Sequence, residues 1–192
     1  MNIKKKYALI SVFDKTDLSY ICQTLLKFNI GLISTGSTAK TIKKSGFKCK
    51  LVSDLTKFKE ILDGRVKTLH PKIHASILHD RKNKYHIHTF KKLNFPIIDF
   101  VIVNLYPFEK ITTTTSNISK CIEMIDIGGP AMLGSAAKNF ESVTTIIDPE
   151  DYDDLSKILI KNSGKTNIKF RKKMADQAKK WTPAEHFFQM GP

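Results

Sequence analysis

The sequence has few cysteines, few arginines and no long apolar run, and each shortage argues against a class of protein. Cys22, Cys49 and Cys121 are widely spaced and form no CxxC pair, which disfavours a disulfide framework or a thiolate zinc site and fits a reducing cytoplasm. No apolar run reaches the length of a membrane span, and the run near the start stops at Asp14 without a signal-peptide cleavage site. We therefore expect a cytoplasmic protein that does not bind a membrane.

The charge of the chain is strongly unbalanced, with 32 Lys or Arg against 18 Asp or Glu and a formal net charge of +14. Clustered basic residues are typical of nucleic-acid binding. However, Arg65, Arg81 and Arg171 are the only arginines, and the lysines are spread over the whole chain. The densest basic run, residues 157–180, is typical of a solvated helix surface. The composition therefore favours a globular protein without a nucleic-acid partner.

Short apolar runs alternate with helical patterns along the chain. YALISV, residues 7–12, predicts a buried parallel strand, and apolar residues at helical spacing predict a helix over 16–28. PIIDFVIVN, residues 96–104, is rich in β-branched and aromatic residues and predicts a central strand. Further strands are expected near 30–34 and 143–147, and further helices over 39–44, over 118–125, over 131–138 and after Pro149. This alternation predicts an α/β fold with a mostly parallel sheet flanked by helices.

Polar clusters follow three of the predicted strands, at the carboxyl ends where ligands bind in such folds. In STGST, residues 34–38, Gly36 permits a tight turn, and hydroxyls and N–H groups at a helix start can cradle a phosphate. A helix cap without a ligand is the alternative. SVFDKT adds Ser11 and Lys15, and a lysine beside hydroxyls suits a phosphate monoester, although it can also be a plain surface residue.

The stretch DGRVKTLHPKIHASILH can be read as a metal site, a nucleic-acid patch or an anion pocket. His70 and His74 have the spacing of helical zinc ligands, but no HExxH glutamate accompanies them. Arg65, Lys67 and Thr68 follow a glycine, and a guanidinium with an ammonium suits an anionic substrate. We therefore expect an anion pocket without a metal, and histidines that make structural hydrogen bonds or lie on the surface.

A second glycine-rich segment, EMIDIGGPAMLGSAAKN, places Asp126 before the Gly128–Gly129 turn and Lys138 near the end of the next predicted helix. N–H groups at such a turn can stabilise a developing oxyanion. A carboxylate and a lysine held in one cleft can move protons in opposite directions. The alternative is an Asp that caps the helix and a Lys that covers its end.

Taken together, ALISVFDKT, STGSTAK, GRVKTLHPKIHASIL, NLYPFEK, IDIGGPAMLGSAAKN and VTTIIDPEDY resemble, in this order, the IMP cyclohydrolase domain of the bifunctional AICAR transformylase/IMP cyclohydrolase family. The resemblance covers about residues 7–152 and is highly specific in GRVKTLHP, NLYPF and IDIGGP. It implies a three-layer methylglyoxal-synthase-like fold. It also implies a cofactor-free cyclohydrolase that closes the ribotide FAICAR (5-formamidoimidazole-4-carboxamide ribotide) to IMP and water, the last step of de novo purine biosynthesis.

The resemblance also assigns site residues, none of them to a metal. The positions that match those holding the ribotide phosphate are Ser11, Lys15, Ser34, Gly36, Ser37 and Thr38. The positions that match those binding the base or taking part in catalysis are Arg65, Lys67, Thr68, Asn104, Tyr106, Asp126, Ile127, Gly128 and Lys138. Of these, Lys67, Tyr106, Asp126 and Lys138 are implied to be catalytic.

The sequence departs from the family pattern at several points. Phe13 stands where the family has a small polar residue and Asp17 where it has Gly, so we expect a reshaped phosphate loop. The pattern is lost after Ala178, and we expect a cyclohydrolase domain over 1–152, a helical extension over 153–180 and a divergent tail over 181–192. Transformylase activity is therefore not expected on this chain, and a separate AICAR transformylase would supply the substrate. The resemblance suggests a homodimer.

Two other functions fit parts of the same pattern. The fold also serves as a regulatory ligand-binding domain, so an inactive or regulatory phosphate-binding remnant is one alternative. Such a module would need only the STGST and Lys15 loops, whereas Lys67, Tyr106, Asp126 and Lys138 are present together as well. A methylglyoxal synthase shares the STGST-type loop but is disfavoured by GRVKTLHP and NLYPF.

Overall fold

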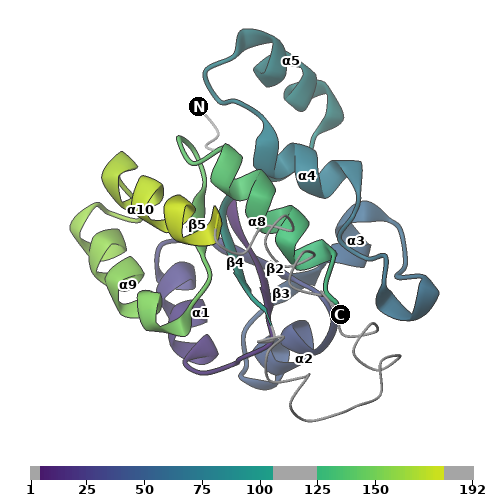
Figure 1. Cartoon of the computed structure of the whole chain (residues 1–192), viewed down its shortest axis with the longest axis horizontal. Coiled ribbons are helices and arrows are strands. Elements are labelled where there is room, and N and C mark those ends of the chain that lie inside the picture. Colours follow the sequence, from purple (N-terminus) through teal and green to yellow (C-terminus); the bar gives the residue numbers. More distant parts are fainter. Residues whose placement is uncertain (1–4, 106–124, 180–192) are drawn as a thin grey trace, which may run out of the picture.

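The structure is a computed structural model that describes residues 5–105 and 125–179, and it places one sheet between two layers of helices (Figure 1). The strands are β1 (Lys6–Val12), β2 (Gly31–Ser34), β3 (Cys49–Leu51), β4 (Ile97–Asn104) and β5 (Thr144–Ile146). The helices are α1 (Leu18–Lys27), α2 (Gly36–Lys44), α3 (Val52–Thr56), α4 (Pro71–Leu78), α5 (Lys84–Leu93), α8 (Gly128–Lys138), α9 (Tyr152–Lys161) and α10 (Ile168–Lys179). The segments η1 (Leu62–Gly64) and η2 (Pro149–Asp151) are short 3₁₀ turns.

The sheet has the strand order β3-β2-β1-β4-β5, and every neighbouring pair is parallel. Ile10 of β1 lies opposite Ser34 of β2, and Val12 lies opposite Asn104 of β4. From β1 the chain adds β2 and β3 on one side of the sheet, and then β4 and β5 on the other side. The strand order therefore reverses between β1 and β4. Parallel α/β sheets bind ligands outside the carboxyl ends of the strands at such a point. The predicted fold class is confirmed.

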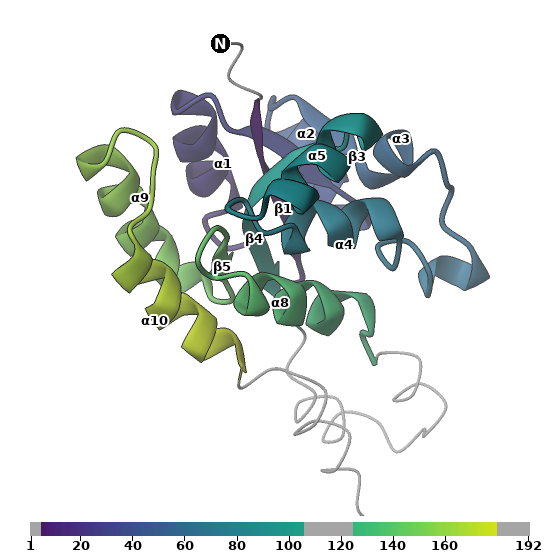
Figure 2. The same ribbon diagram turned by 90° about the horizontal axis from the view of Figure 1, so that it is seen from above.

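Alternate residues of β1 face the two helical layers. Ala8, Ile10 and Val12 pack in one core cluster with α1 and α9, whereas Leu9 packs in a second cluster with α4 and α8. Figure 2 shows α1 and α9 on one side of the strands and α4 and α8 on the other. Each fully buried aliphatic side chain contributes about 1.5–3 kcal/mol to the free energy of unfolding, which makes these two clusters the main source of stability.

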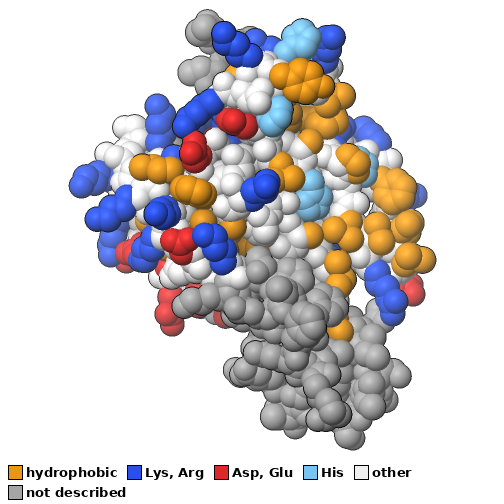
Figure 3. Space-filling model, turned by 45° about the horizontal axis from the view of Figure 1, so that its top comes forward, with side chains coloured by type: hydrophobic (Ala, Val, Ile, Leu, Met, Phe, Trp, Pro, Cys, Tyr) orange, Lys and Arg blue, Asp and Glu red, His pale blue; other side chains and the backbone are white. Residues whose placement is uncertain are grey.

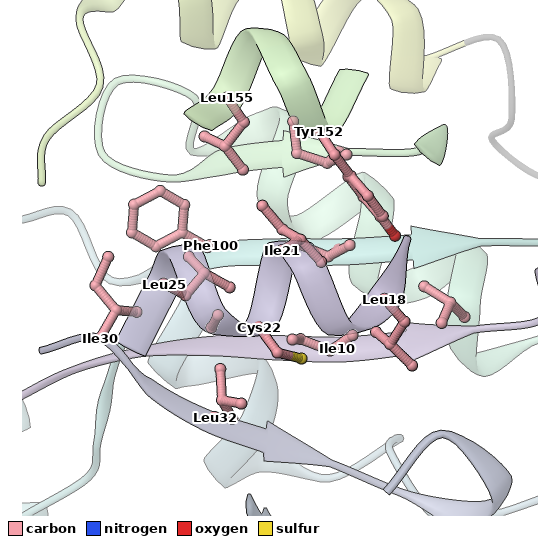
Figure 4. Packing of buried hydrophobic residues seen from close by; sticks show 14 of the residues in the cluster. Ile10, Leu18, Ile21, Cys22, Leu25, Ile30, Leu32, Phe100, Tyr152 and Leu155 are labelled. Carbon is pink, nitrogen blue, oxygen red and sulfur yellow. The ribbon is translucent and has the colours of Figure 1, made fainter. Parts of the chain in front are cut away.

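The helical extension expected over 153–180 belongs to the same core. Leu155 and Leu159 of α9 and Met174 of α10 are buried in the cluster that contains β1. Figure 4 shows Tyr152 and Leu155 packed over the side chains of α1. The helix α10 also contacts α8 and β5. Residues 153–179 therefore complete one layer of the domain and do not form a separate linker.

Several element boundaries differ from the predicted ones. The helix α2 begins at Gly36, directly after β2, and α8 begins at Gly128 with Pro130 in its first turn. Proline is tolerated there because the first N–H groups of a helix have no intrahelical partner. The elements β3, α3, α4 and α5 were not predicted. The helix expected over 118–125 lies almost entirely outside the described residues.

Candidate active site

The phosphate cradle predicted from STGST lies at the junction of β2 and α2. Gly36 has φ +56, a left-handed backbone that favours glycine. The hydroxyl of Ser34 donates to the Ile10 carbonyl at 2.6 Å, and the hydroxyl of Thr38 accepts from the Val12 N–H and donates to the Val12 carbonyl at 3.1 and 2.9 Å. Ser34 thus ties the end of β2 to β1, and Thr38 ties the first turn of α2 to β1. An anion in the cradle can accept hydrogen bonds from the N–H groups of the first turn of α2 and from the exposed Ser37 hydroxyl.

The loop after β1 is held by the end of β4. The Asn104 side-chain oxygen accepts from the N–H groups of Phe13 and Asp14 at 2.7 and 2.9 Å, and its nitrogen donates to the Asp14 carbonyl at 3.0 Å. The Lys15 ammonium donates to the carbonyls of Val12 and Phe13 at 3.4 and 3.1 Å, which keeps its charge at the sheet edge. Asn104, predicted to bind substrate, thus uses its amide to shape this loop. Ser11 is half-buried and lies on β1 next to Val12, the last residue of the strand.

Asp17, which stands where the family has glycine, adopts φ +52 and ψ +19 at the N-cap of α1 and makes no side-chain cap hydrogen bond. An Asp tolerates this left-handed backbone better than most residues, but glycine suits it best. Asp14 stabilises the same loop, because its carboxylate accepts from the N–H and the hydroxyl of Thr16 at 2.8 and 2.7 Å. The hydrogen bonds between Asp14 and Thr16 therefore stabilise the loop that leads into Asp17.

A tight turn places Lys67 at the cradle. Ile61 and Val66 form an antiparallel bridge, and Leu62 and Asp63 between them both have φ +53. Lys67 follows this turn, and its ammonium nitrogen lies 3.9 Å from the position that a Cβ on Gly36 would occupy. The structure thus brings the predicted cradle and the predicted anion pocket together, although they are about thirty residues apart in sequence.

The histidines of this region make structural contacts. His70 caps α4 by accepting from the Lys72 N–H at 3.0 Å, His74 Nδ1 lies 2.9 Å from the Ser135 hydroxyl, and His79 stacks on Phe90 with ring centroids 3.8 Å apart. Burial lowers the pKa of His74 and of His79, which keeps both rings neutral near pH 7. Among the described residues, no cluster of His, Cys, Asp or Glu could hold a metal ion. The predicted structural hydrogen bonds are found for His70 and His74, whereas His79 packs by ring stacking.

Asp126, Gly128 and Thr68 meet at the start of α8. The Asp126 carboxylate is exposed and accepts from the Gly129 N–H at 3.1 Å, so it caps the helix. The hydroxyl of Thr68, which is 1% exposed, lies 2.4 Å from where a Cβ on Gly128 would be. Ile127 is 47% exposed at the same turn. The predicted oxyanion turn at Gly128 therefore lies against Thr68, the neighbour of Lys67 in the sequence.

Replacing Gly128 with alanine is expected to lower the free energy of unfolding by about 1–3 kcal/mol, because the new methyl group overlaps the enclosed Thr68 hydroxyl. The matched control is Gly134→Ala on the same helix, where a Cβ meets nothing within 4 Å. There alanine should stabilise the helix by about 0.5–1 kcal/mol. Urea denaturation measures the free energy of unfolding of both variants. Changes of equal sign and size in the two variants would contradict a close contact between Gly128 and Thr68.

Two predicted catalytic residues are not brought to this edge by the described structure. Lys138 is exposed in the last turn of α8, whereas Asp126 precedes its first turn, and ten residues of helix span about 15 Å. The expected cleft shared by these two charges is therefore absent. Tyr106 lies outside the described residues. Thr35, within the predicted STGST segment, is the N-cap residue of α2 but makes no side-chain cap hydrogen bond.

The basic run at 157–180 carries paired charges. Lys157 and Asp153 are 2.8 Å apart, Lys173 and Asp154 are 3.5 Å apart, and Lys179 and Asp176 are 2.8 Å apart. Figure 3 shows basic and acidic side chains mixed on the left, over α9 and α10, with other basic side chains scattered over the visible face. This is the arrangement of a solvated helix surface. Across residues 5–105 and 125–179, no helix is long and apolar enough to cross a membrane.

Known proteins match this chain over nearly its whole length. Residues 17–131 match the MGS-like domain family, and residues 136–185 match the AICARFT/IMPCHase bienzyme family. The bifunctional purine biosynthesis protein PurH of Bradyrhizobium diazoefficiens is 46% identical over 171 residues, which cover 89% of this chain and 32% of that protein. PurH of Acetivibrio thermocellus is 51% identical over 148 residues, which cover 77% of this chain and 29% of that protein.

The solved structure titled "Crystal structure of ForH" superposes with a TM-score of 0.82 at 30% identity, over 92% of this chain and 93% of that one. The chain spans about a third of the length of the curated relatives. The chain thus belongs to the MGS-like domain family, and its sequence corresponds to the IMP cyclohydrolase-like domain of PurH.

Proposed function

We propose that this chain is an IMP cyclohydrolase that closes FAICAR to IMP and water. The observation that carries the proposal is the position of Lys67, whose ammonium lies over the Gly36 turn while the next residue, Thr68, contacts the start of α8 at Gly128. One short segment thus connects an anion cradle with a helix start that bears an exposed carboxylate. A phosphorylated substrate bound between them would meet both a cation and a base.

The reaction is intramolecular, because the carboxamide nitrogen attacks a formyl carbon held on the same ring. The protein must therefore mainly orient the two groups and stabilise charge. In the proposed mechanism Asp126 accepts the amide proton, and Lys67 stabilises the formyl oxygen as it becomes negative and helps it to leave as water. Tyr106 is proposed to support the proton path. Lys138 lies too far along α8 to take part directly in this geometry.

No cofactor enters the proposed reaction, since ring closure with loss of water transfers no electrons and no external group. Ser37, Gly36 and Lys15 are proposed to hold the phosphate, together with the ends of β1 and β2. Arg65 is proposed to neutralise the remaining phosphate charge from the turn before Lys67.

The test is conversion of synthetic FAICAR to IMP by the purified chain, followed by absorbance. We expect saturable turnover well above the uncatalysed rate, and the same turnover in a Lys161→Ala control, which changes an exposed residue at the end of α9. Saturable binding of IMP without any turnover would replace the proposal with a regulatory, phosphate-binding remnant. Absence of both binding and turnover would reject the nucleotide site itself.

A further inference from the structure

A groove of about 420 Å³ lies beside the phosphate cradle, between α2, the start of α3 and residues 58–60. It adjoins the cradle at Thr35 and Gly36 and the proposed catalytic region at Lys67, all three of which line it. The groove is therefore continuous with the proposed substrate site. The proposed cyclization uses only the end of the groove that touches Gly36 and Lys67.

The groove is lined mainly by cationic side chains. Lys40, Lys43, Lys59 and Lys67 line it, against a single carboxylate from Glu60. Within the described ranges none of these four ammonium groups forms an ion pair. Some lysines elsewhere form ion pairs, as over α9 and α10. The groove differs from the rest of the surface in placing four lysines on one concave wall against a single carboxylate. The groove thus concentrates uncompensated positive charge.

The shape of the groove strengthens this charge. Lys40 and Lys43 are three residues apart on α2, so both side chains lie on the same side of the helix. Leu51, Val52 and Phe58 form apolar parts of the wall. A concave wall of low polarity focuses the field of the charges it carries and draws in oppositely charged ligands. An anion placed between the lysines would relieve their mutual repulsion.

We propose that this groove holds the distal phosphates of a nucleoside 5′-triphosphate whose first phosphate occupies the cradle. The inference rests on the proposed function, because it takes the cradle as the site of a 5′-phosphate. Ammonium groups act as point charges that bind phosphate oxygens without a fixed geometry, which suits a flexible phosphate chain. Such a triphosphate competes with the monophosphate substrate, so the groove makes the site sensitive to nucleoside triphosphates.

The test compares IMP with inosine 5′-triphosphate, which differ only in the number of phosphates, by titration calorimetry in metal-free buffer. The wild type should bind the triphosphate at least ten times more tightly than IMP. The groove variant Lys40→Ala/Lys43→Ala/Lys59→Ala should weaken triphosphate binding at least tenfold and IMP binding by no more than about threefold. The matched control Lys27→Ala/Lys44→Ala/Lys48→Ala removes the same charge from exposed residues outside the groove and should keep the preference.

Equal affinity of the wild type for IMP and the triphosphate would overturn the inference. So would equal losses in the groove variant and the control, because the effect would then come from net charge alone. FAICAR turnover is measured on the same wild-type sample to separate the two proposals. Turnover without a triphosphate preference rejects only the groove, whereas a groove-dependent preference without turnover rejects only the cyclohydrolase.

Discussion

A Lys67→Ala variant is expected to convert FAICAR at least a hundred times more slowly than the wild type. Loss of a group that stabilises a developing oxyanion typically lowers kcat by about 10²–10³. The KM should rise less than about tenfold, because Lys15 and the N–H groups of α2 still hold the phosphate. Steady-state kinetics with absorbance detection measure both constants.

The control for this variant is Lys161→Ala, which removes the same charge from the exposed end of α9 and should leave both constants unchanged. Equal losses in the two variants would exclude a specific role for Lys67. A hundredfold rise in KM with an unchanged kcat would assign the ammonium to the phosphate alone, consistent with its position against Gly36.

An Asp126→Asn variant is expected to lose at least a hundredfold in kcat while its free energy of unfolding stays within about 0.5 kcal/mol of the wild type. General-base catalysis typically contributes about 10²–10⁴ in rate, and an amide cannot accept the proton. Asn nevertheless serves as well as Asp at a helix cap, so its side-chain oxygen can still accept from the Gly129 N–H. Kinetics and urea denaturation of the same sample separate the two effects.

The companion variant Asp126→Ala removes both functions and should lose about 1 kcal/mol of unfolding free energy in addition to the activity. If Asp126→Asn kept more than about a tenth of the wild-type turnover, another group would have to take the amide proton. The pair of variants therefore distinguishes a catalytic carboxylate from one that only caps α8.

The central part of the fold could be predicted because its signals are local. The apolar runs of β1 and β4 and the helical spacing in α1 appear in the structure within a few residues of their predicted bounds. The helix α5 is mostly polar and buries only Phe90, so few apolar residues indicate it in the sequence. The strand β3 is three residues long and half-exposed, too short for a pattern. Packing against neighbours, not local sequence, determines these elements.

Sequence reasoning proposed the residues of the candidate site but not their contacts. It assigned Lys15 and Gly36 to a phosphate cradle and Lys67 to a separate anion pocket, whereas in the structure the Lys67 ammonium lies beside Gly36. Asn104 was assigned to the substrate, whereas its amide holds the loop after β1. Lys138 was expected beside Asp126, but the length of α8 separates them. Both differences depend on three-dimensional geometry that residue types and spacing do not contain.

The short outer strands have a consequence for how copies of this protein can associate. Unpaired edges of a sheet invite strand addition from other chains, which leads to aggregation. Here β3 offers only three residues, with Lys50 at its centre, and β5 also has three residues and is contacted by α10. Neither edge of the described sheet provides a long template for another strand. Self-assembly of this fold is therefore directed to contacts between side chains of helices and loops, and edge-to-edge fibre growth is suppressed.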